Sequence, residues 1–284
     1  MNKTDVTRAL IEMLVSKSIK DVATDPHRSI RNLVEMGQIF STGASQRDFF
    51  DACSTMLENE DSAYYTMLED AVAYIAPDKI IKLGINIGYN GCTLGVKKMR
   101  DYEAETGIRL PWLVYFSVSG NEGDLTVSRI DEIISQAHDS GTCTFILKVG
   151  PGMIPAVIPI IKKYSDAGFI LLVRPDELSD SDINELKEID NVLVSLETAP
   201  EEQEDALFAR CAKLHYWKCP YAVYMFYNDD NAGRVLDNTW INSIEPAGAT
   251  FAFLFPSTDT SEKTIEQIRQ YVLDIRANQE YPFI

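Results

Sequence analysis

Residues 1–78 carry apolar side chains at helical spacing. Such side chains recur every three or four positions in three stretches, at residues 10–15, 30–39 and 64–75. Residues Ser45 to Asp48 have the S-x-x-D form that often begins a helix. Pro77 predicts the end of the last stripe, because proline cannot continue a helix. The pattern therefore predicts a helical N-terminal subdomain over residues 1–78.

After Pro77 the pattern changes to short and mostly continuous apolar runs. These runs lie at residues 80–87, 112–118, 143–149, 169–173, 192–196, 221–227 and 250–255. Continuous runs are typical of parallel strands that are buried on both faces. The stretches between them have helical spacing, at residues 127–137, 154–164, 181–189, 202–214 and 262–277. Strand alternating with helix predicts an α/β fold over residues 79–284, either a parallel barrel or an open sheet.

The composition is that of a globular protein, with 45% hydrophobic and 24% charged residues. The net charge of −17 argues against a nucleic-acid binder and against a partner on an anionic membrane, since both need surplus Lys and Arg. The five cysteines show no CxxC spacing, which predicts neither a disulfide framework nor a structural zinc site. With no signal peptide and no membrane span expected, we predict a cytoplasmic protein.

The acidic excess is concentrated in two segments of the chain. Residues 175–205 hold twelve acidic residues and one basic residue, and residues 1–78, with thirteen acidic and seven basic residues, hold the rest of the excess. A solvated helix face accounts for such a charge run. The alternative is that the 175–205 region is a docking surface for a basic protein partner.

Polar residues follow several of the predicted strands. In parallel α/β folds the chemistry lies at the carboxyl ends of the strands, which form the mouth of a barrel. Lys148 and Arg174 would hold an anion such as a carboxylate or phosphate. Glu197 would pair with one of them or act as an acid or base, with Tyr224 or Tyr227 assisting. The alternative is that these are ordinary strand-end charges, solvated or paired with one another.

Read from Ile81, the sequence resembles the radical S-adenosylmethionine family. In that family the first strand leads into a loop of the form C-x-x-x-C-x-x-C, and here KLGINIGYNG leads into CTLGVKKM, with Cys92 in the place of the first cysteine. The run FILKVGPGMIPAVIPIIKKY is similar to the family's second strand, glycine-rich turn and helix. Residues Ser195 to Glu197 fill the place of a Ser-x-Asp motif. The resemblance covers residues 80–256 and implies a partial TIM-like (β/α)6 barrel, in which residues 112–118 are an insertion.

Two departures from the family bear on function. Val96 and Met99 occupy the second and third cysteine positions, whereas the family's iron-sulfur cluster takes three thiolates. The family motif Gly-Gly-Glu-Pro is replaced by residues Val149 to Gly152, so its acidic residue is missing. We therefore expect no iron-sulfur cluster, no radical chemistry and no resident cofactor.

Two functional classes follow from these observations. The first is a non-enzymatic binding module that takes a small molecule, a peptide or a protein at the mouth. Its expected ligand-binding residues are Asn86, Cys92, Lys148, Gly150, Gly152, Arg174, Ser195, Glu197 and Tyr224. The second is an enzyme in which Glu197 is the acid or base while Lys148 and Arg174 orient an anionic substrate. Retained S-adenosylmethionine binding, or a metal at the Cys92 loop with ligands from elsewhere, are further alternatives.

Overall fold

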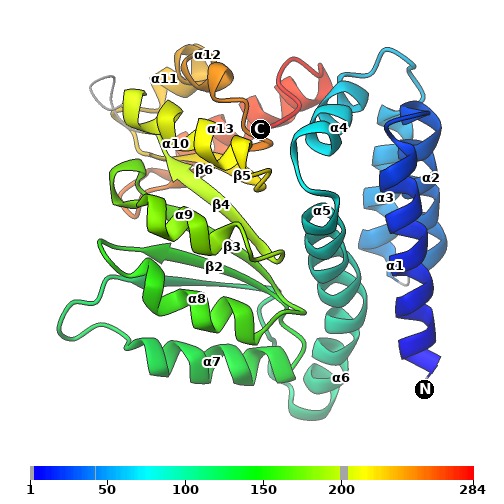
Figure 1. Ribbon diagram of the computed structural model, residues 1–284, viewed down its shortest axis with the longest axis horizontal. Helices are drawn as coiled ribbons and strands as arrows, with labels where there is room; N and C mark the ends of the chain where they lie inside the picture. Colours follow the sequence, from blue (N-terminus) through cyan, green and yellow to red (C-terminus); the bar gives the residue numbers. More distant parts are fainter. Residues whose placement is uncertain (1–2, 42, 199–203) are drawn as a thin grey trace.

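Six parallel strands form the half-barrel in the computed structural model, which describes residues 3–41, 43–198 and 204–284 (Figure 1). The strands are β1 (Leu113–Val118), β2 (Thr144–Val149), β3 (Gly168–Val173), β4 (Val192–Glu197), β5 (Tyr221–Tyr227) and β6 (Phe251–Pro256). Their order in the sheet is their order in the chain, and every neighbouring pair is parallel. This arrangement confirms the predicted α/β fold with a partial barrel and N-terminal helices.

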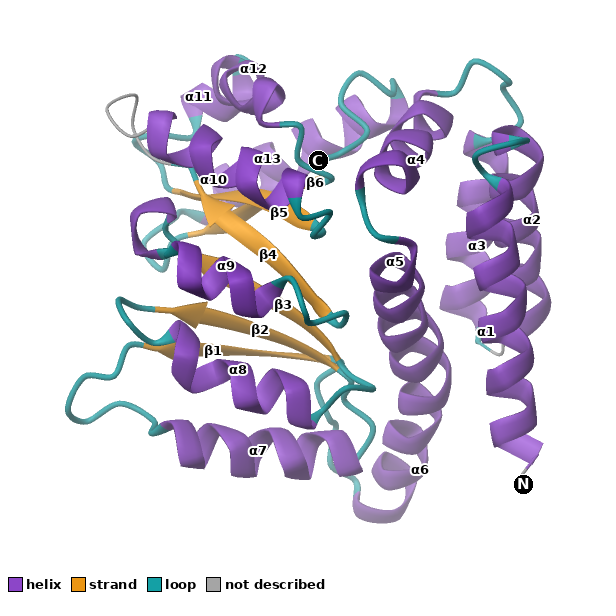
Figure 2. Cartoon of the chain, in the orientation of Figure 1, coloured by secondary structure: helices purple, strands orange, loops and turns teal. Residues whose placement is uncertain are grey.

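Helices cover the outer face of the half-barrel (Figure 2). They are α7 (Val127–Asp139), α8 (Ile154–Lys163), α9 (Asp180–Leu186), α10 (Glu204–Tyr216), α11 (Gly233–Leu236), α12 (Thr239–Ile244) and α13 (Glu262–Ala277), with 3-10 turns η2 (Pro175–Glu177) and η4 (Glu245–Ala247). The main core lies between these helices and the sheet, where Phe145, Leu171 and Val223 are fully buried. Alternate strand residues point to the opposite, inner face, because side chains alternate along a strand.

The N-terminal region is helical, as its apolar spacing predicts. It contains α1 (Lys3–Asp21), α2 (Pro26–Phe40), α3 (Ala44–Met56) and α4 (Ala63–Tyr74). Helix α3 begins at Ala44, one residue before the predicted start at Ser45. Within the described ranges, no helix combines the length and the apolarity that crossing a membrane requires. The division of the chain into units at residues 78 and 79 stays a prediction.

The apolar run at residues 80–87 is helical, and its prediction as the first strand is wrong. Helix α5 (Pro77–Gly84) continues through a π-helical segment, η1 (Ile85–Gly95), into α6 (Val96–Thr106). Ile81, Ile85 and Tyr89 are four residues apart and are buried in one cluster that includes residues of α1. A continuous apolar run hides this helical spacing. The first strand is instead β1, at the residues that the family resemblance assigns to an insertion.

Buried amides fix the long helix to the start of β3. The Asn86 amide Nδ2 donates to the carbonyl oxygens of Ser165, at 2.9 Å, and Ala167, at 2.8 Å. Asn90 Nδ2 donates to the carbonyl oxygen of Asp166 at 2.8 Å. These three carbonyls immediately precede β3, so the helix crosses the amino ends of the strands, as Figure 1 shows.

Candidate functional site

The inner face gathers four of the predicted site residues toward the carboxyl end of the half-barrel. Lys148 and Ser195 are each paired in register with Leu172 on β3, and Glu197 is paired with Tyr224. The spacing of two residues between Ser195 and Glu197 places both on the inner side of β4. Strand alternation and the parallel register therefore bring these groups together, as the strand-end pattern predicts.

Glu197 interacts with two tyrosines on this face. The Tyr224 hydroxyl donates to Glu197 Oε2 at 3.3 Å. Burial of the Tyr224 ring and the nearby Glu197 carboxylate raise the pKa of Tyr224 well above its usual range. Burial, and then the charge of Glu197, also raise the pKa of Tyr115 on β1. The curvature of the half-barrel thus brings Tyr115 under the influence of a carboxylate three strands away.

The two predicted anion-binding cations both have partners within the protein. The Arg174 guanidinium makes two bonds of 3.1 Å to the Asp176 carboxylate, and this pairing raises the pKa of Arg174. Lys148 Nζ lies 4.2 Å from the centre of the Phe226 ring, which is a cation–π contact. Arg174 is therefore already paired in the bidentate geometry that an external carboxylate would use.

Glu177, in the turn after β3, joins this group. Its side chain is 13% exposed and lies 3.7 Å from Arg174, while burial raises the pKa of its carboxyl group. Neither Glu177 nor Tyr115 is among the residues predicted from the sequence. We call the combined set the mouth cluster, and it consists of Tyr115, Lys148, Arg174, Glu177, Glu197 and Tyr224.

Ser195 is completely buried, with a side-chain hydroxyl that has no hydrogen-bond partner in the described part of the chain. It lies two residues before Glu197 on the inner side of β4, with Leu172 and Ala222 beside it in register. Buried polar groups in proteins are nearly always hydrogen-bonded. The Ser195 hydroxyl is therefore an exception that the protein's own side chains do not explain.

Aromatic rings form the adjoining wall of the inner face. Tyr224, Phe226 and Phe255 contact one another, with ring centres 5.6 to 6.0 Å apart. Phe253 continues the wall and lies 6.2 Å from Phe255. Ile146 and Leu172 are buried in the same apolar cluster. The mouth cluster thus combines charged groups with an apolar, aromatic surface.

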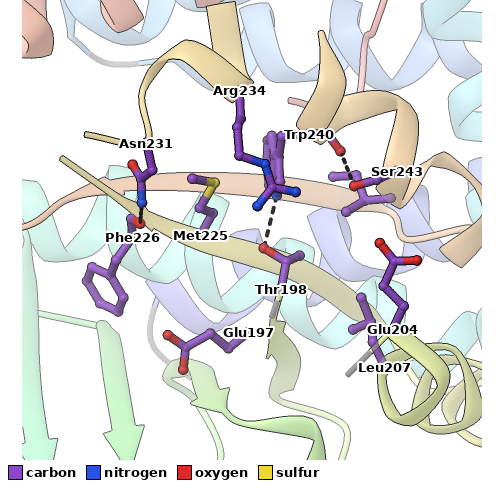
Figure 3. A pocket seen from close by; sticks show the side chains of 11 residues that line it. Glu197, Thr198, Glu204, Leu207, Met225, Phe226, Asn231, Arg234, Trp240 and Ser243 are labelled. Atoms are coloured by element: carbon purple, nitrogen blue, oxygen red, sulfur yellow. Dashed lines mark hydrogen bonds between the residues drawn. The ribbon is translucent and has the colours of Figure 1, made fainter. Parts of the chain in front are cut away.

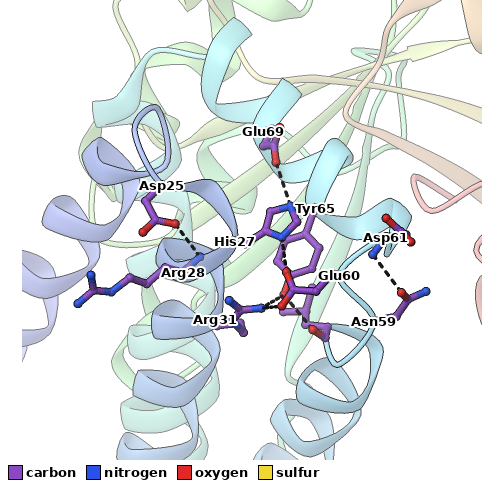
Figure 4. Close-up of polar contacts among 10 residues, drawn as sticks. Asp25, His27, Arg28, Arg31, Asn59, Glu60, Asp61, Tyr65 and Glu69 are labelled. Carbon is purple, nitrogen blue, oxygen red and sulfur yellow. Dashed lines mark hydrogen bonds and ion pairs between the residues drawn. The ribbon is translucent and has the colours of Figure 1, made fainter.

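A pocket of about 130 Å³ adjoins the mouth cluster where β4 and β5 end (Figure 3). Glu197 and Phe226 line both the pocket and the inner face. The other residues around it are Thr198, Glu204, Leu207, Met225, Asn231, Arg234, Trp240, Ser243 and Ile244. The Trp240 indole donates to the Thr198 hydroxyl at 2.9 Å, which fixes α12 against the end of β4. The pocket offers space for a small group beside Glu197.

Asn86 and Cys92 lie at the other end of the strands, so the prediction that they reach the mouth is wrong. The Asn86 side chain is fully buried and binds carbonyls that precede β3. Cys92 lies within the π-helical segment, and burial raises the pKa of its thiol. The misplacement follows directly from the helix at residues 80–87, because strand-end logic does not apply to a helix.

Gly150 and Gly152 lie in the turn after β2, as predicted. The Gly150 amide donates to the Val118 carbonyl at 2.9 Å, and a Cβ on Gly150 would lie 3.3 Å from Ser119 Cα. Gly152 has a φ of +72°, which glycine adopts without strain. Both glycines therefore have a clear role in the turn that connects β2 with α8.

The residues around Cys92 do not fit an iron-sulfur cluster. Val96 has no ligand atom, and Met99 is a buried side chain whose sulfur lies 4.0 Å from the Thr142 hydroxyl. Such clusters are held by thiolates. Across the residues that the structure describes, no three His, Cys, Asp or Glu side chains are grouped so that they could hold a metal ion.

The acidic 175–205 region is partly neutralised by the protein itself. Asp180 pairs with Arg210 and Lys213, both at 2.5 Å, and Asp190 lies 3.3 Å from the buried ammonium of Lys79. Residues 199–203 of this region lie outside the described residues. A basic protein partner for the region stays a prediction.

Comparison with known proteins gives a distant likeness of fold. No protein-family model and no curated protein matches the sequence. Streptococcus suis SuiB bound to the precursor peptide SuiA is similar at 10% identity and a TM-score of 0.45, over 66% of this chain and 51% of that one. SuiB bound to S-adenosylmethionine is similar at 9% identity and a TM-score of 0.45, over 87% of this chain and 63% of that one. The chain thus spans between half and two thirds of the SuiB chains, and its likeness to them concerns the fold alone.

Proposed function

We propose that this protein binds a small organic molecule at the mouth cluster and does not perform cluster-dependent radical chemistry. The observation that carries the proposal is the buried Ser195 hydroxyl without a hydrogen-bond partner. Leaving a buried hydroxyl unpaired costs about 1–3 kcal/mol. A polar atom of a ligand would complete the hydrogen bonding of Ser195 and offset this cost once the side chains that cover the hydroxyl move aside.

The inner face of the half-barrel around the mouth cluster indicates the general form of the ligand. Binding sites for small molecules are usually apolar surfaces with a few polar groups that fix orientation. Here Phe226, Phe253 and Phe255 supply the apolar surface, and Glu197 and Tyr224 supply the polar groups. We therefore expect a ligand with a flat apolar body and a polar substituent.

An enzymatic use of the same groups is the second candidate. The hydrogen bond from Tyr224 to Glu197 is the observation that favours it, because a carboxylate held beside a hydroxyl can accept or return a proton. Glu197 would be the acid or base, and a substrate would have to bring a labile proton within hydrogen-bond distance of its carboxylate. This candidate shares its binding surface with the proposed function and adds a chemical step.

We expect the Ser195→Ala variant to be more stable than the wild-type protein when no ligand is present. Removing an unpaired buried hydroxyl should gain about 1 kcal/mol, which corresponds to a melting temperature about 2 °C higher for a domain of this size. Thermal denaturation followed by circular dichroism measures the change.

Ser62→Ala is the matched control for this measurement. Ser62 is also buried, at 2% exposure, but its hydroxyl donates to Gln279 Oε1 at 2.9 Å. Its replacement should therefore lower the melting temperature. A Ser195→Ala variant that loses stability as Ser62→Ala does would show that Ser195 is already satisfied within the protein, and would remove the basis of the proposal.

The absence of radical chemistry is tested on protein purified without oxygen. We expect substoichiometric iron and sulfide, because Val96 and Met99 cannot supply the thiolates that a cluster needs. Calorimetric titration with S-adenosylmethionine on the same preparation tests for retained binding of that molecule. Stoichiometric iron with an equal amount of sulfide would contradict this part of the proposal.

A further inference from the structure

We infer that the ligand of the mouth cluster is a cationic aromatic amine, in which the ammonium group pairs with Glu197 while the ring packs on the phenylalanine wall. The inference rests on the proposed function and names the chemical class of its ligand. It is carried by the charge balance of the mouth cluster, the aromatic surface beside Glu197 and the unpaired hydroxyl of Ser195.

The charge balance depends on which groups are already paired. Among the described residues Glu197 makes no ion pair within 4.0 Å, and its one hydrogen bond comes from the neutral Tyr224 hydroxyl. Arg174, the cation at the end of the adjacent strand, is held in two bonds by Asp176. Lys148 lies over the Phe226 ring. Glu197 is therefore a carboxylate that makes no direct ion pair among the described residues, although Arg174 acts on it at longer range and Arg234 lines the same pocket.

The remaining carboxylates strengthen this preference. Asp176 and Glu177 both lie beside Arg174, at 3.1 Å and 3.7 Å. Together with Asp176 and the pocket residues Glu204 and Arg234, the mouth cluster holds four carboxylates against three cations, and the charge that remains is negative. At Arg174 an anionic ligand would have to displace Asp176, and elsewhere at the mouth it would meet the repulsion of Glu197, whereas an ammonium ligand would displace no ion pair.

The aromatic wall favours an ammonium group that carries a ring. A cation over an aromatic face is attracted by the ring, and aromatic pairs add to the apolar contact. Lys148 on Phe226 shows that this wall already accommodates one ammonium group. Phe253 and Phe255 are partly buried and belong to the same wall, so they offer surface to the ring of a ligand.

Ser195 accounts for a third contact. Its hydroxyl can donate to one group and accept from another, and at present it does neither. Because Ser195 is completely buried, a hydroxyl or an ammonium group on the ligand would reach it only after the side chains that cover it on the inner side of β4 move aside. A phenol that carries an alkylammonium chain contains all the required groups.

Three probes that differ in charge test the inference by isothermal titration calorimetry. Tyramine carries an ammonium group, 4-ethylphenol has no charge, and 3-(4-hydroxyphenyl)propionate carries a carboxylate. We expect tyramine to bind about tenfold more tightly than 4-ethylphenol, since an ion pair with a partly buried carboxylate and a cation–π contact together contribute about 1.4 kcal/mol. The propionate should bind most weakly.

Two variants with the same change in charge locate the effect. Glu197→Gln should bring the affinity for tyramine down to that for 4-ethylphenol. Glu185→Gln removes a carboxylate from the exposed side of α9 and should leave the preference unchanged. Circular dichroism confirms that both variants are folded.

The outcomes separate the inference from the proposed function. Equal affinity for tyramine and 4-ethylphenol, or tighter binding of the propionate, would overturn the cationic class and leave small-molecule binding in place. A preference for tyramine that survives in Glu197→Gln would also overturn it. Failure of all three probes to bind at millimolar concentration, with folded protein, would contradict the inference and the proposed function together.

Discussion

Replacing Gly95 by alanine should destabilise the protein by about 3 kcal/mol, because the new methyl group would overlap the backbone of a neighbouring turn. A Cβ on Gly95 would lie 2.1 Å from the Gly141 carbonyl oxygen and 2.9 Å from the Asn90 carbonyl oxygen. Backbone atoms cannot move aside as a flexible side chain can. The helix would therefore have to move away from the amino end of β2, and urea denaturation would measure the loss of stability.

Gly88→Ala, in the same helical segment, is the control for this prediction. Gly88 is exposed, and a Cβ there would meet no atom within 4 Å. Alanine at an exposed helical position should add about 0.5–1 kcal/mol of stability, since it loses less conformational entropy on folding than glycine does. Two substitutions seven residues apart in one helix should thus have opposite signs. Equal stability of the two variants would show that residues 85–95 do not pack against Gly141.

Replacing Asn86 by alanine should also cost about 3 kcal/mol, which combines the loss of buried hydrogen bonds with a small cavity. The amide holds the Ser165 and Ala167 carbonyls, and its oxygen accepts from Asn90 at 3.2 Å. Asn191 would still bond the Ala167 carbonyl at 3.0 Å, but the Ser165 carbonyl would lose this partner. Urea denaturation would show the loss as a lower midpoint.

Asn184→Ala tests whether the effect depends on burial. Asn184 is exposed on α9, and its replacement should change the stability by less than about 0.5 kcal/mol. The folded Asn86→Ala variant should also bind tyramine as the wild-type protein does, because Asn86 lies at the opposite end of the strands from Glu197. A stable Asn86→Ala variant with weakened ligand binding would instead support the sequence-based placement of Asn86 at the mouth.

The strands that are buried on both faces were predictable from the sequence. The run at residues 169–173 became β3 (Gly168–Val173), and the run at 192–196 became β4 (Val192–Glu197). Each such strand is covered by helices on one side and by other inner-face side chains on the other, so nearly every position is apolar. The same argument fails at residues 80–87, because a helix packed between α1 and the strands also shows a continuous apolar run.

The candidate site was predictable only where one strand determines the geometry. The two-residue spacing of Ser195 and Glu197 places both on the same face of β4 whatever the rest of the fold does. The place of Tyr115 in the mouth cluster could not be predicted, because it depends on the curvature that brings β1 toward β4. The pairing of Arg174 with Asp176 also escaped prediction, because two residues so close in sequence pair only when the turn after β3 brings their side chains together.

The sequence by itself determined the class of fold, the helical N-terminal region and the loss of the thiolates that a cluster would require. These properties depend on local spacing or on the chemical identity of single residues such as Val96. Only the tertiary structure decided that residues 77–106 form one long helix, and that Asn86 and Cys92 lie away from the mouth. It also decided that Glu197 makes no direct ion pair among the described residues while Arg174 is paired with Asp176. Which charges are paired depends on distances between separate strands and turns, and no pattern along the chain contains those distances.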